Sequence, residues 1–286
     1  MTQSSNGLRF LALILSFTIA GAAVAQQAPA GPDVINRYRG RQERARELTS
    51  DLLSALLQSH IQQLEDNKLT DLPLYKDLVD MRARMGELTM KMMPEVIDLL
   101  VQATDATGDD RLALINQAQG KMREVLLRLL AERERIRVRR QQAELIERLS
   151  EIIGKQKNTR SATIALGGMD EQAILAVVDS QGNVNTLYAT FAAMIQDVAT
   201  WSGELGAIAA ESGRILKNQK VEEHLDGAGT YLMALKFNDA TVEQQAVVDA
   251  LEKVLAEIRK LEDPAAIDKD VVEAVKQLIK EQEALL

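Results

Sequence analysis

Five of the ten methionines lie between residues 81 and 93, and their thioethers are the sharpest candidate for chemistry in this sequence. Thioether sulfur is a soft ligand that suits Cu(I). Met81, Met85 and Met92 share one face at helical spacing, so they are the candidate ligands of a soft-metal site. The same spacing suits an apolar stripe, where methionine is ordinary adaptable filling. We favour packing and keep a helical-bundle site for a small ligand or metal over residues 78–100 as the alternative.

The two histidines form no ligand pattern with their neighbours in the sequence. His60 lies on a leucine-rich helical face, which predicts a position at the edge of the core. His224 stands at the entry to a helix, where we expect a solvated or capping role. Neither has a carboxylate or a second histidine three or four residues away, as the Glu-x-x-His pairs of di-iron bundles require.

Motifs for nucleophilic catalysis and phosphate binding are also absent from the sequence. There is no cysteine, which excludes disulfides, thiolate metal sites and a cysteine nucleophile. There is no Gly-x-Ser-x-Gly elbow and no phosphate-binding loop. The many carboxylates fall on helix faces, where they act as solvating charge. We therefore expect no enzymatic activity, no cofactor and no dedicated metal site.

A run of arginines and glutamates over residues 131–142 is a candidate interaction face, with Arg133, Arg137 and Arg140 among its cations. Because glutamates interrupt the run, a solvated coiled-coil face is the favoured interpretation. Docking against an acidic surface, on this chain or on another copy, is the alternative. A second candidate face is the apolar seam that follows, formed by Ile146, Leu149 and Ile153. Such a seam needs a partner, so we expect dimers or higher oligomers.

The elements that carry these residues are predicted to be long helices. Aromatic residues make up only 3% of the chain, and apolar residues make up 46%. This composition is typical of long helices and coiled coils, and it is too apolar for disorder. The fold class is therefore predicted to be all-α, with long antiparallel helices, helical hairpins and an extended coiled-coil element.

The first 25 residues are predicted to be a signal peptide. Residues 10–20 are apolar, and Ala23-Val24-Ala25 has the small-x-small pattern of a cleavage site. The apolar run is shorter than the ~20 residues of a membrane span, so cleavage after Ala25 is favoured over an uncleaved anchor. We expect an extracytoplasmic protein, in the bacterial periplasm, that contacts a membrane only through this segment. Residues 26–32 form a flexible leader.

The leader precedes two predicted regions, a long-helix region over residues 33–166 and an acidic helical-hairpin region over residues 167–286. Asp33 is the expected N-cap of the first helix, and Pro94 should disturb the second. Residues 171–201 form one helix or two, with one favoured. The expected hairpin over residues 221–260 turns at Asn238-Asp239. The expected helices cover residues 33–66, 73–104, 110–166, 171–201, 203–219, both arms of the 221–260 hairpin, and 268–285.

The helix over 110–166 is expected to carry a heptad seam. The seam consists of Ile115, Ala118, Met122, Val125 and Leu129, and it resumes at Ala143, Ile146 and Ile153, flanked by Leu145, Leu149 and Ile152. Residues 131–142 between the two parts should run through solvent or along a narrow seam. About 55 helical residues span roughly 80 Å. A compact globule of this size has a diameter of roughly 47 Å, so we expect an elongated molecule or a projecting arm.

Charge is distributed unevenly along the chain, whose formal net charge is −8. Residues 26–160 hold 23 Lys/Arg against 21 Asp/Glu, whereas residues 161–286 hold 10 against 21. An acidic chain with no dense basic patch is a poor binder of nucleic acid. The two halves are instead expected to attract each other, or to pair head to tail between copies.

Residues 224–260 resemble a hairpin of large exported helical proteins of planctomycete-type bacteria. The matching positions are Leu225, Ala228, Leu232, Leu235, Gln245, Ala250, Leu251 and Leu255. The Arg-rich stretch with residues 141–147 (QQAELIE) is similar to the same group. The resemblance covers about a third of the chain and implies an extracytoplasmic coiled-coil protein of uncharacterised role. It implies no functional residues, and Asn238-Asp239 replaces the usual Gly-Asp turn.

The sequence thus favours an exported helical scaffold or protein-interaction protein that associates with itself or with a protein partner. The alternatives are the small-ligand or soft-metal module and a periplasmic holdase-type chaperone. The chain closes at Leu286 without a cap or a polar tail. A natural terminus is favoured there, and a longer polypeptide is the alternative.

Overall fold

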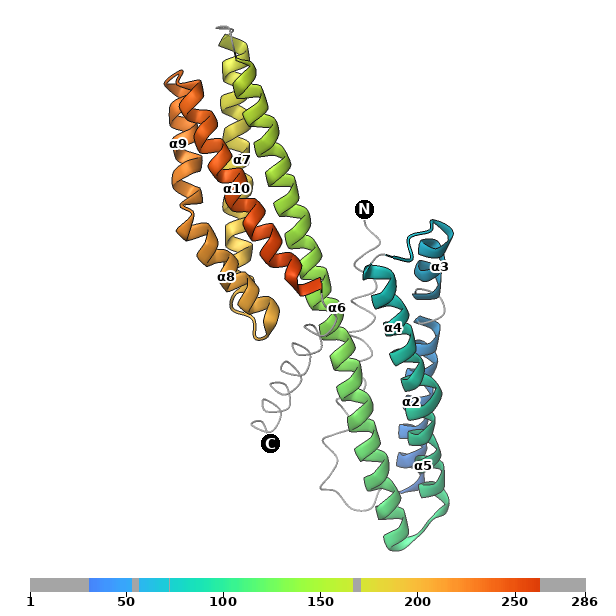
Figure 1. Cartoon of the computed structure of the whole chain (residues 1–286). Helices are drawn as coiled ribbons and strands as arrows, with labels where there is room; N and C mark the ends of the chain where they lie inside the picture. Colours follow the sequence, from blue (N-terminus) through green and yellow to red (C-terminus); the bar gives the residue numbers. More distant parts are fainter. Residues whose placement is uncertain (1–30, 53–56, 72, 167–170, 263–286) are drawn as a thin grey trace. The chain divides into compact units, whose positions relative to one another are not determined.

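The computed structural model describes residues 31–52, 57–71, 73–166 and 171–262 (Figure 1). These residues form helices and turns, without any strand, so the predicted all-α class is confirmed. The signal segment, Gly167–Asp170 and the helix expected over 268–285 lie outside the described residues. The chain divides into two compact units, unit 1 (Met1–Arg133) and unit 2 (Glu134–Leu286). This division falls inside the long helix, whereas the sequence suggested a boundary at its end.

The first described helix, α2 (Pro32–Leu52), begins one residue earlier than expected. The carbonyl of Gly31 accepts the amides of Val34 and Ile35, so Gly31 occupies the cap position. Pro32 takes the first helical position, where its missing N–H costs nothing. Asp33 therefore lies in the first turn and is not the N-cap, although its charge still suits the helix dipole.

Unit 1 continues with α3 (Gln58–Asp66), α4 (Pro73–Glu87), the π-helical turn η3 (Leu88–Met92) and α5 (Met93–Asp105). Residues 53–56, which carry the first part of the expected leucine stripe, lie outside the described residues. Ile61 of that stripe is fully buried. His60, however, is exposed, so the predicted position at the edge of the core is wrong. Helix α3 buries the next residue, Ile61, and His60 points away from that face.

The disturbance expected at Pro94 takes the form of η3. The amide of Met93 donates to Leu88, five residues back, in place of Thr89. Pro94 has no amide proton to offer in turn, so the Thr89 carbonyl loses both helical donors. Arg46 of α2 supplies the replacement, because its Nε lies 3.0 Å from that carbonyl oxygen. The π-turn is thus completed by a side chain from another helix.

Long helix α6 (Gly108–Ala165) is continuous over 58 residues, as the sequence predicted, and contributes to both units. In unit 1 it buries Ala118, Val125 and Leu129. The stretch over 131–142 does not run wholly through solvent, since Glu132, Glu134, Val138 and Gln142 are buried. Glu132 accepts two hydrogen bonds from Arg84, at 2.6 and 3.2 Å, which pairs its buried carboxylate.

In unit 2, α6 buries only part of the expected seam: Ile153 and the flanking Leu145, Leu149 and Ile152 are buried. Ala143 is exposed and Ile146 only partly buried. Apart from Ile153, the buried positions alternate in steps of four and three residues: Val138, Gln142, Leu145, Leu149, Ile152, Gln156, Thr159 and Thr163. Three of these eight are glutamine or threonine near the end of the helix, which an apolar pattern cannot identify.

Unit 2 is a bundle of four rods: the second part of α6, α7 (Glu171–Val198), α8 (Glu204–Asn218) followed by α9 (Val221–Met233), and α10 (Phe237–Arg259) with the short η4 (Lys260–Glu262). Helix α7 passes through Gly182 without a break, so the favoured single helix is confirmed. Hydrogen bonds tie α6 to its neighbours, because Gln142 donates to the Ile258 carbonyl and Gln156 pairs with Gln181.

The turn between α9 and α10 lies at residues 234–236, not at Asn238-Asp239 as predicted. Leu235 takes the left-handed conformation there, with φ of 60°, and is exposed rather than part of the apolar stripe. Its amide donates to Leu232, and the amide of Lys236 donates to Tyr231. This is the pairing of a Schellman C-cap, where glycine is usual. Asp239 instead lies in the first turn of α10, where its charge suits the helix N-terminus.

The turn between α7 and α8 depends on Gly206, which lies against the backbone of Trp201. A Cβ at Gly206 would collide with the Trp201 carbonyl, whereas a Cβ at Gly213 of the same helix would lie 3.7 Å from Ile195. The first contact forces a backbone shift, and the second is ordinary van der Waals contact. Only Gly206 is therefore sterically required.

We expect Gly206→Ala to lower the free energy of unfolding of unit 2 by about 1–3 kcal/mol because of overpacking. Gly213→Ala, the matched control, should be neutral or stabilising by up to about 1 kcal/mol because alanine favours helix. Urea titration followed by circular dichroism and by the fluorescence of Trp201, the single tryptophan, measures both effects. Equal behaviour of the two variants would contradict the steric explanation.

Arg46→Ala should destabilise unit 1 by about 1–2 kcal/mol, because it leaves the Thr89 carbonyl without a donor. Arg44→Ala is the control, since Arg44 lies on the exposed side of the same helix. Denaturant unfolding of the two variants tests the expectation. Indistinguishable midpoints would show that water replaces Arg46 at the π-turn.

Burial raises the pKa of Tyr188 to about 12, and the charge of Glu222 contributes to the rise. In the unfolded chain a tyrosine titrates near 10. The native state therefore favours the neutral phenol, and the stability that this provides below pH 10 should be lost as the pH rises towards 12. Screening by solvent reduces the expected loss to about 1 kcal/mol. Tyr188→Phe should remove this part of the pH dependence in thermal unfolding, and Tyr231→Phe should not.

Candidate interaction surfaces

The apolar seam proposed as an interaction face is already covered by the chain itself. Leu149 is fully buried and Ile153 is 7% exposed, both inside unit 2, while Ile146 is partly buried. These residues pack within the four-rod bundle, so they are not free for another molecule. The expectation of oligomers therefore loses the seam on which it was based.

The three arginines of the proposed charged face have different surroundings. The guanidinium of Arg137 stacks 3.8 Å from the ring centroid of Trp201 and forms an ion pair with Glu134 at 3.1 Å. A stacked guanidinium over an indole is a favourable cation–π contact. Arg133 is partly exposed, and Arg140 is exposed. Both Arg137 and Arg140 are exposed, but Arg137 contacts residues of its own chain.

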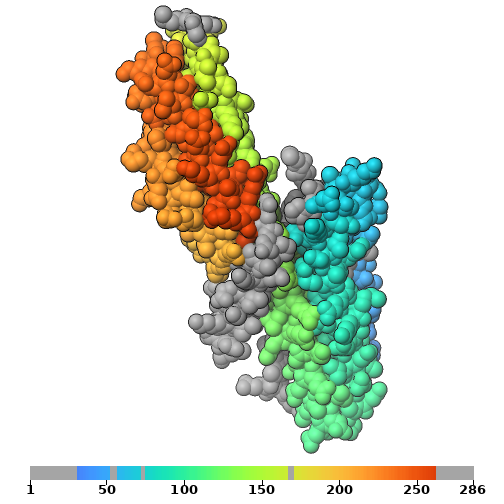
Figure 2. All heavy atoms as spheres, in the orientation of Figure 1, coloured from blue at the N-terminus to red at the C-terminus, as the bar shows by residue number. Residues whose placement is uncertain are grey.

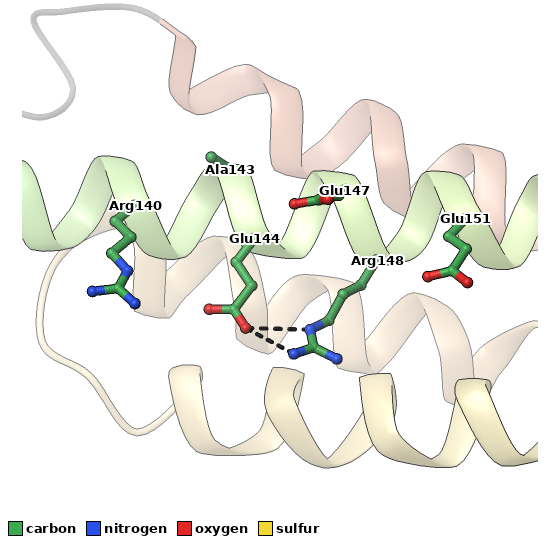
Figure 3. Close-up of a pocket in the computed structure, with 6 residues that line it drawn as sticks. All are labelled: Arg140, Ala143, Glu144, Glu147, Arg148 and Glu151. Atoms are coloured by element: carbon green, nitrogen blue, oxygen red, sulfur yellow. Dashed lines mark hydrogen bonds and ion pairs between the residues drawn. The ribbon is translucent and has the colours of Figure 1, made fainter. Parts of the chain in front are cut away.

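Arg140 belongs to an outer strip of α6 that borders a hollow of about 460 Å³ (Figure 3). The strip consists of Arg140, Ala143, Glu144, Glu147, Arg148 and Glu151. Arg148 donates to Glu144 at 2.9 and 3.3 Å. Within the part of the chain that the structure describes, Arg140 and Glu147 form no ion pair, although they carry opposite charges. We call this set the α6 strip.

The methionine cluster lies in the core of unit 1. Met85, Met92 and Met93 are buried among the apolar side chains of that core, and Met81 packs against them. Met90 points outward and is 74% exposed. In the described residues no group of three or more histidine, aspartate or glutamate side chains is placed to hold a metal ion. The surroundings of Met81, Met85 and Met92 are those of core packing.

His224 is partly exposed and does not cap its helix, and its side chain has a partner that the sequence did not predict. Its Nδ1 contacts Oε2 of Glu243, so the ring ties α9 to α10. The pair is partly buried, and the α9 cap position is taken by Lys220. The contact joins the two helices of the hairpin.

No protein-family model, curated protein or solved structure matches the chain. Function must therefore be argued from surfaces alone. None of the described helices combines the length and apolar character needed to cross a bilayer.

A second surface, which the sequence did not reveal, lies at one end of unit 2. It consists of large apolar side chains that are 53–69% exposed: Ile164, Leu175, Met233, Leu235 and Val242. Figures 1 and 2 show the α9–α10 turn and the facing ends of α6 and α7 at the same end of unit 2. Leu166, Tyr231 and Phe237 pack against the buried cluster of Val177, Leu232 and Ala240. We call the exposed set the apolar end.

Of the apolar end, the sequence pattern involved only Leu235, which it placed in an apolar stripe. Met233 follows the buried Leu232, and Ile164 follows the buried Thr163, so each is out of phase with the seam of its helix. An apolar residue out of phase is unremarkable alone, since single exposed apolar residues are common. Their recurrence at the same end of four helices becomes visible only when the topology is known.

Proposed function

We propose that this protein is an exported helical scaffold that associates with a second copy of itself through the α6 strip. The observation that supports the proposal is a pair of exposed and opposite charges, Arg140 and Glu147, which form no ion pair with any residue that the structure describes and lie on either side of Ala143 and Glu144. A surface that must pair with itself about a two-fold axis needs such a self-complementary pattern.

The spacing of the strip favours an antiparallel crossing of two α6 helices. If the two-fold axis passes between Ala143 and Glu144, Arg140 of each copy faces Glu147 of the other. Two reciprocal ion pairs then form across the axis. The small side chain of Ala143 at the crossing allows close approach of the helices. The Glu144–Arg148 pair can remain intact in each copy.

The strength of this association should be modest and salt-dependent. Exposed ion pairs contribute about 0–1 kcal/mol each, so two reciprocal pairs add little beyond packing at the crossing. We expect a dissociation constant of roughly 10 µM to 1 mM. The contact should weaken as salt shortens the Debye length. A scaffold of this kind would assemble where the protein is locally concentrated.

Sedimentation velocity of the chain from residue 26 onwards, at about 1–500 µM, tests the proposal. We expect a monomer–dimer equilibrium in low salt that shifts towards monomer in about 0.5 M salt. Arg140→Glu and Glu147→Arg should each weaken the dimer, because like charges then face each other across the axis. The double variant should restore it, because the reciprocal pairs re-form with exchanged signs.

Arg259→Glu is the matched control, since Arg259 is an exposed arginine of unit 2 outside the strip. It changes the net charge as Arg140→Glu does, and it should leave the dimer unchanged. A chain that stays monomeric at every concentration and salt would overturn the proposal. So would a double variant no better than the two single ones.

A further inference from the structure

Towards the apolar end of unit 2, polar side chains are buried while large apolar side chains are exposed. In α6, Thr163 is buried and the next residue, Ile164, is exposed. In α7 and α10, Gln181 and Gln244 are buried along with Val177 and Ala240, while Leu175 and Val242 are exposed. Exchanging polar and apolar positions would serve folding better, because burial of apolar surface is the main driving force.

The polar interior is held together by a hydrogen-bond network across three helices. Gln181 exchanges hydrogen bonds with Gln156 at 3.1 and 3.2 Å, and Gln244 donates to both Gln181 and Thr163 at 3.0 and 3.1 Å. The Oε1 atom of Gln244 is buried without a partner. The network therefore fixes the helices at some cost in stability, and folding alone does not explain the apolar residues outside.

We infer that the apolar end docks on the interface of a lipid bilayer and enters it to the depth of the headgroup–acyl boundary. The remaining described residues of unit 2 expose no further large apolar side chain, so the apolar surface is confined to this end. Tyr231 and Phe237 lie beside it, and Lys236 at the turn lies 6.0 Å from the ring centroid of Tyr231. A basic side chain beside aromatic rings suits a membrane interface, where the ammonium group stays in water.

The backbone of the α9–α10 turn is already prepared for an apolar environment. The amides of Ala234, Leu235 and Lys236 all donate to carbonyls of α9, at 2.9–3.1 Å. A turn with free amides would carry an unsatisfied donor into the interface, at a cost of several kcal/mol. This turn leaves none of those three amides without a partner.

Leu235 itself is unusual for its position. Lys68, Lys220 and Leu235 all take a positive φ at the end of a helix, where glycine is the unstrained choice. The two lysines place a hydrated ammonium in solvent, whereas Leu235 places a leucine there that is 53% exposed. Strain and exposure together point to a role for Leu235 outside the fold.

Size favours a bilayer over a second copy as the occupant. The five side chains offer roughly 200–400 Å² of apolar surface, on the scale of 60–120 Å² for each fully buried residue. A stable protein interface needs about 800 Å² from each partner. A bilayer requires no matching shape, and burial of this area in the interface is enough for reversible binding.

Charge indicates which bilayer is suitable. Glu171, Lys236 and Asp239 are exposed near the apolar end, and they limit the depth of insertion. The part of the sequence that carries it is acidic, since residues 161–286 hold 21 Asp/Glu against 10 Lys/Arg. Anionic lipids should therefore repel it, and a zwitterionic surface should bind better. The sequence predicted no membrane contact beyond the signal segment, so this contact is an addition.

Flotation of the chain from residue 26 onwards with phosphatidylcholine vesicles tests the inference. We expect binding to these vesicles, and weaker binding when a third of the lipid is phosphatidylglycerol. Leu235→Gly should reduce the partition coefficient roughly tenfold, from the loss of one buried leucine. It should also raise the melting temperature, because glycine relieves the positive φ. Weaker binding with higher stability excludes unfolding as the cause.

Two controls separate the apolar end from general effects. Lys220→Gly relieves the same strain at another turn of unit 2, and Met90→Ser removes an exposed apolar side chain of unit 1; neither should change vesicle binding. Absence of vesicle binding, or equal binding by Leu235→Gly and the unaltered chain, overturns the inference. So does capture of unfolded protein without vesicle binding, because the end would then serve a protein partner. Arg140→Glu should bind vesicles normally, which keeps this result independent of self-association.

Discussion

The architecture of unit 2 depends on one buried seam along α6. From Val138 to Thr163 this helix buries a residue every three or four positions. Hydrogen bonds hold α7 and α10 against it: Gln142 and Gln156 donate to Ile258 and Gln181, and Thr163 accepts from Gln244. The α8–α9 rod then fills the remaining side of the bundle by contacting α7 and α10. Because this seam is covered from within the chain, any interface with another molecule must use other faces.

The polar end of the seam sets the register of the helices. A purely apolar seam would tolerate sliding of one helix along another, because leucines in neighbouring turns are nearly equivalent. Gln156, Gln181 and Gln244 must meet at hydrogen-bond distance, so only one axial alignment satisfies them. A buried amide costs free energy when its hydrogen bonds are not made. Alignments that separate these amides are therefore much less stable than the observed one. In our interpretation, unit 2 thereby gives up some stability for a defined geometry of its end.

The sequence predicted the helices well because apolar spacing and proline positions act locally. It identified the continuous α6, the single helix α7 and the disturbance at Pro94. The sequence did not show which of two sets of α6 residues with the same spacing is buried. The sets around Ile146 and Leu149 both fit a heptad, and only the buried glutamines and threonines decide between them. An apolar pattern discards those residues, so a seam that unit 2 itself largely covers was expected to need a second molecule. The turn at Leu235 was missed for a similar reason, because leucine is a poor choice for a positive φ and Asn238-Asp239 looked like the better turn.

The same polar residues explain why the apolar end could not be found from the sequence. Once Thr163 and Gln244 occupy the interior, Ile164 and Val242 are turned outward, because helical positions one or two residues apart do not share a face. Rotating α6 by one residue would bury Ile164 in place of Thr163 and gain apolar burial, but it would break the contact of Thr163 with Gln244. The observed structure therefore couples a polar interior to an apolar exterior at one end, and the exposed surface is a consequence of the alignment that the network selects.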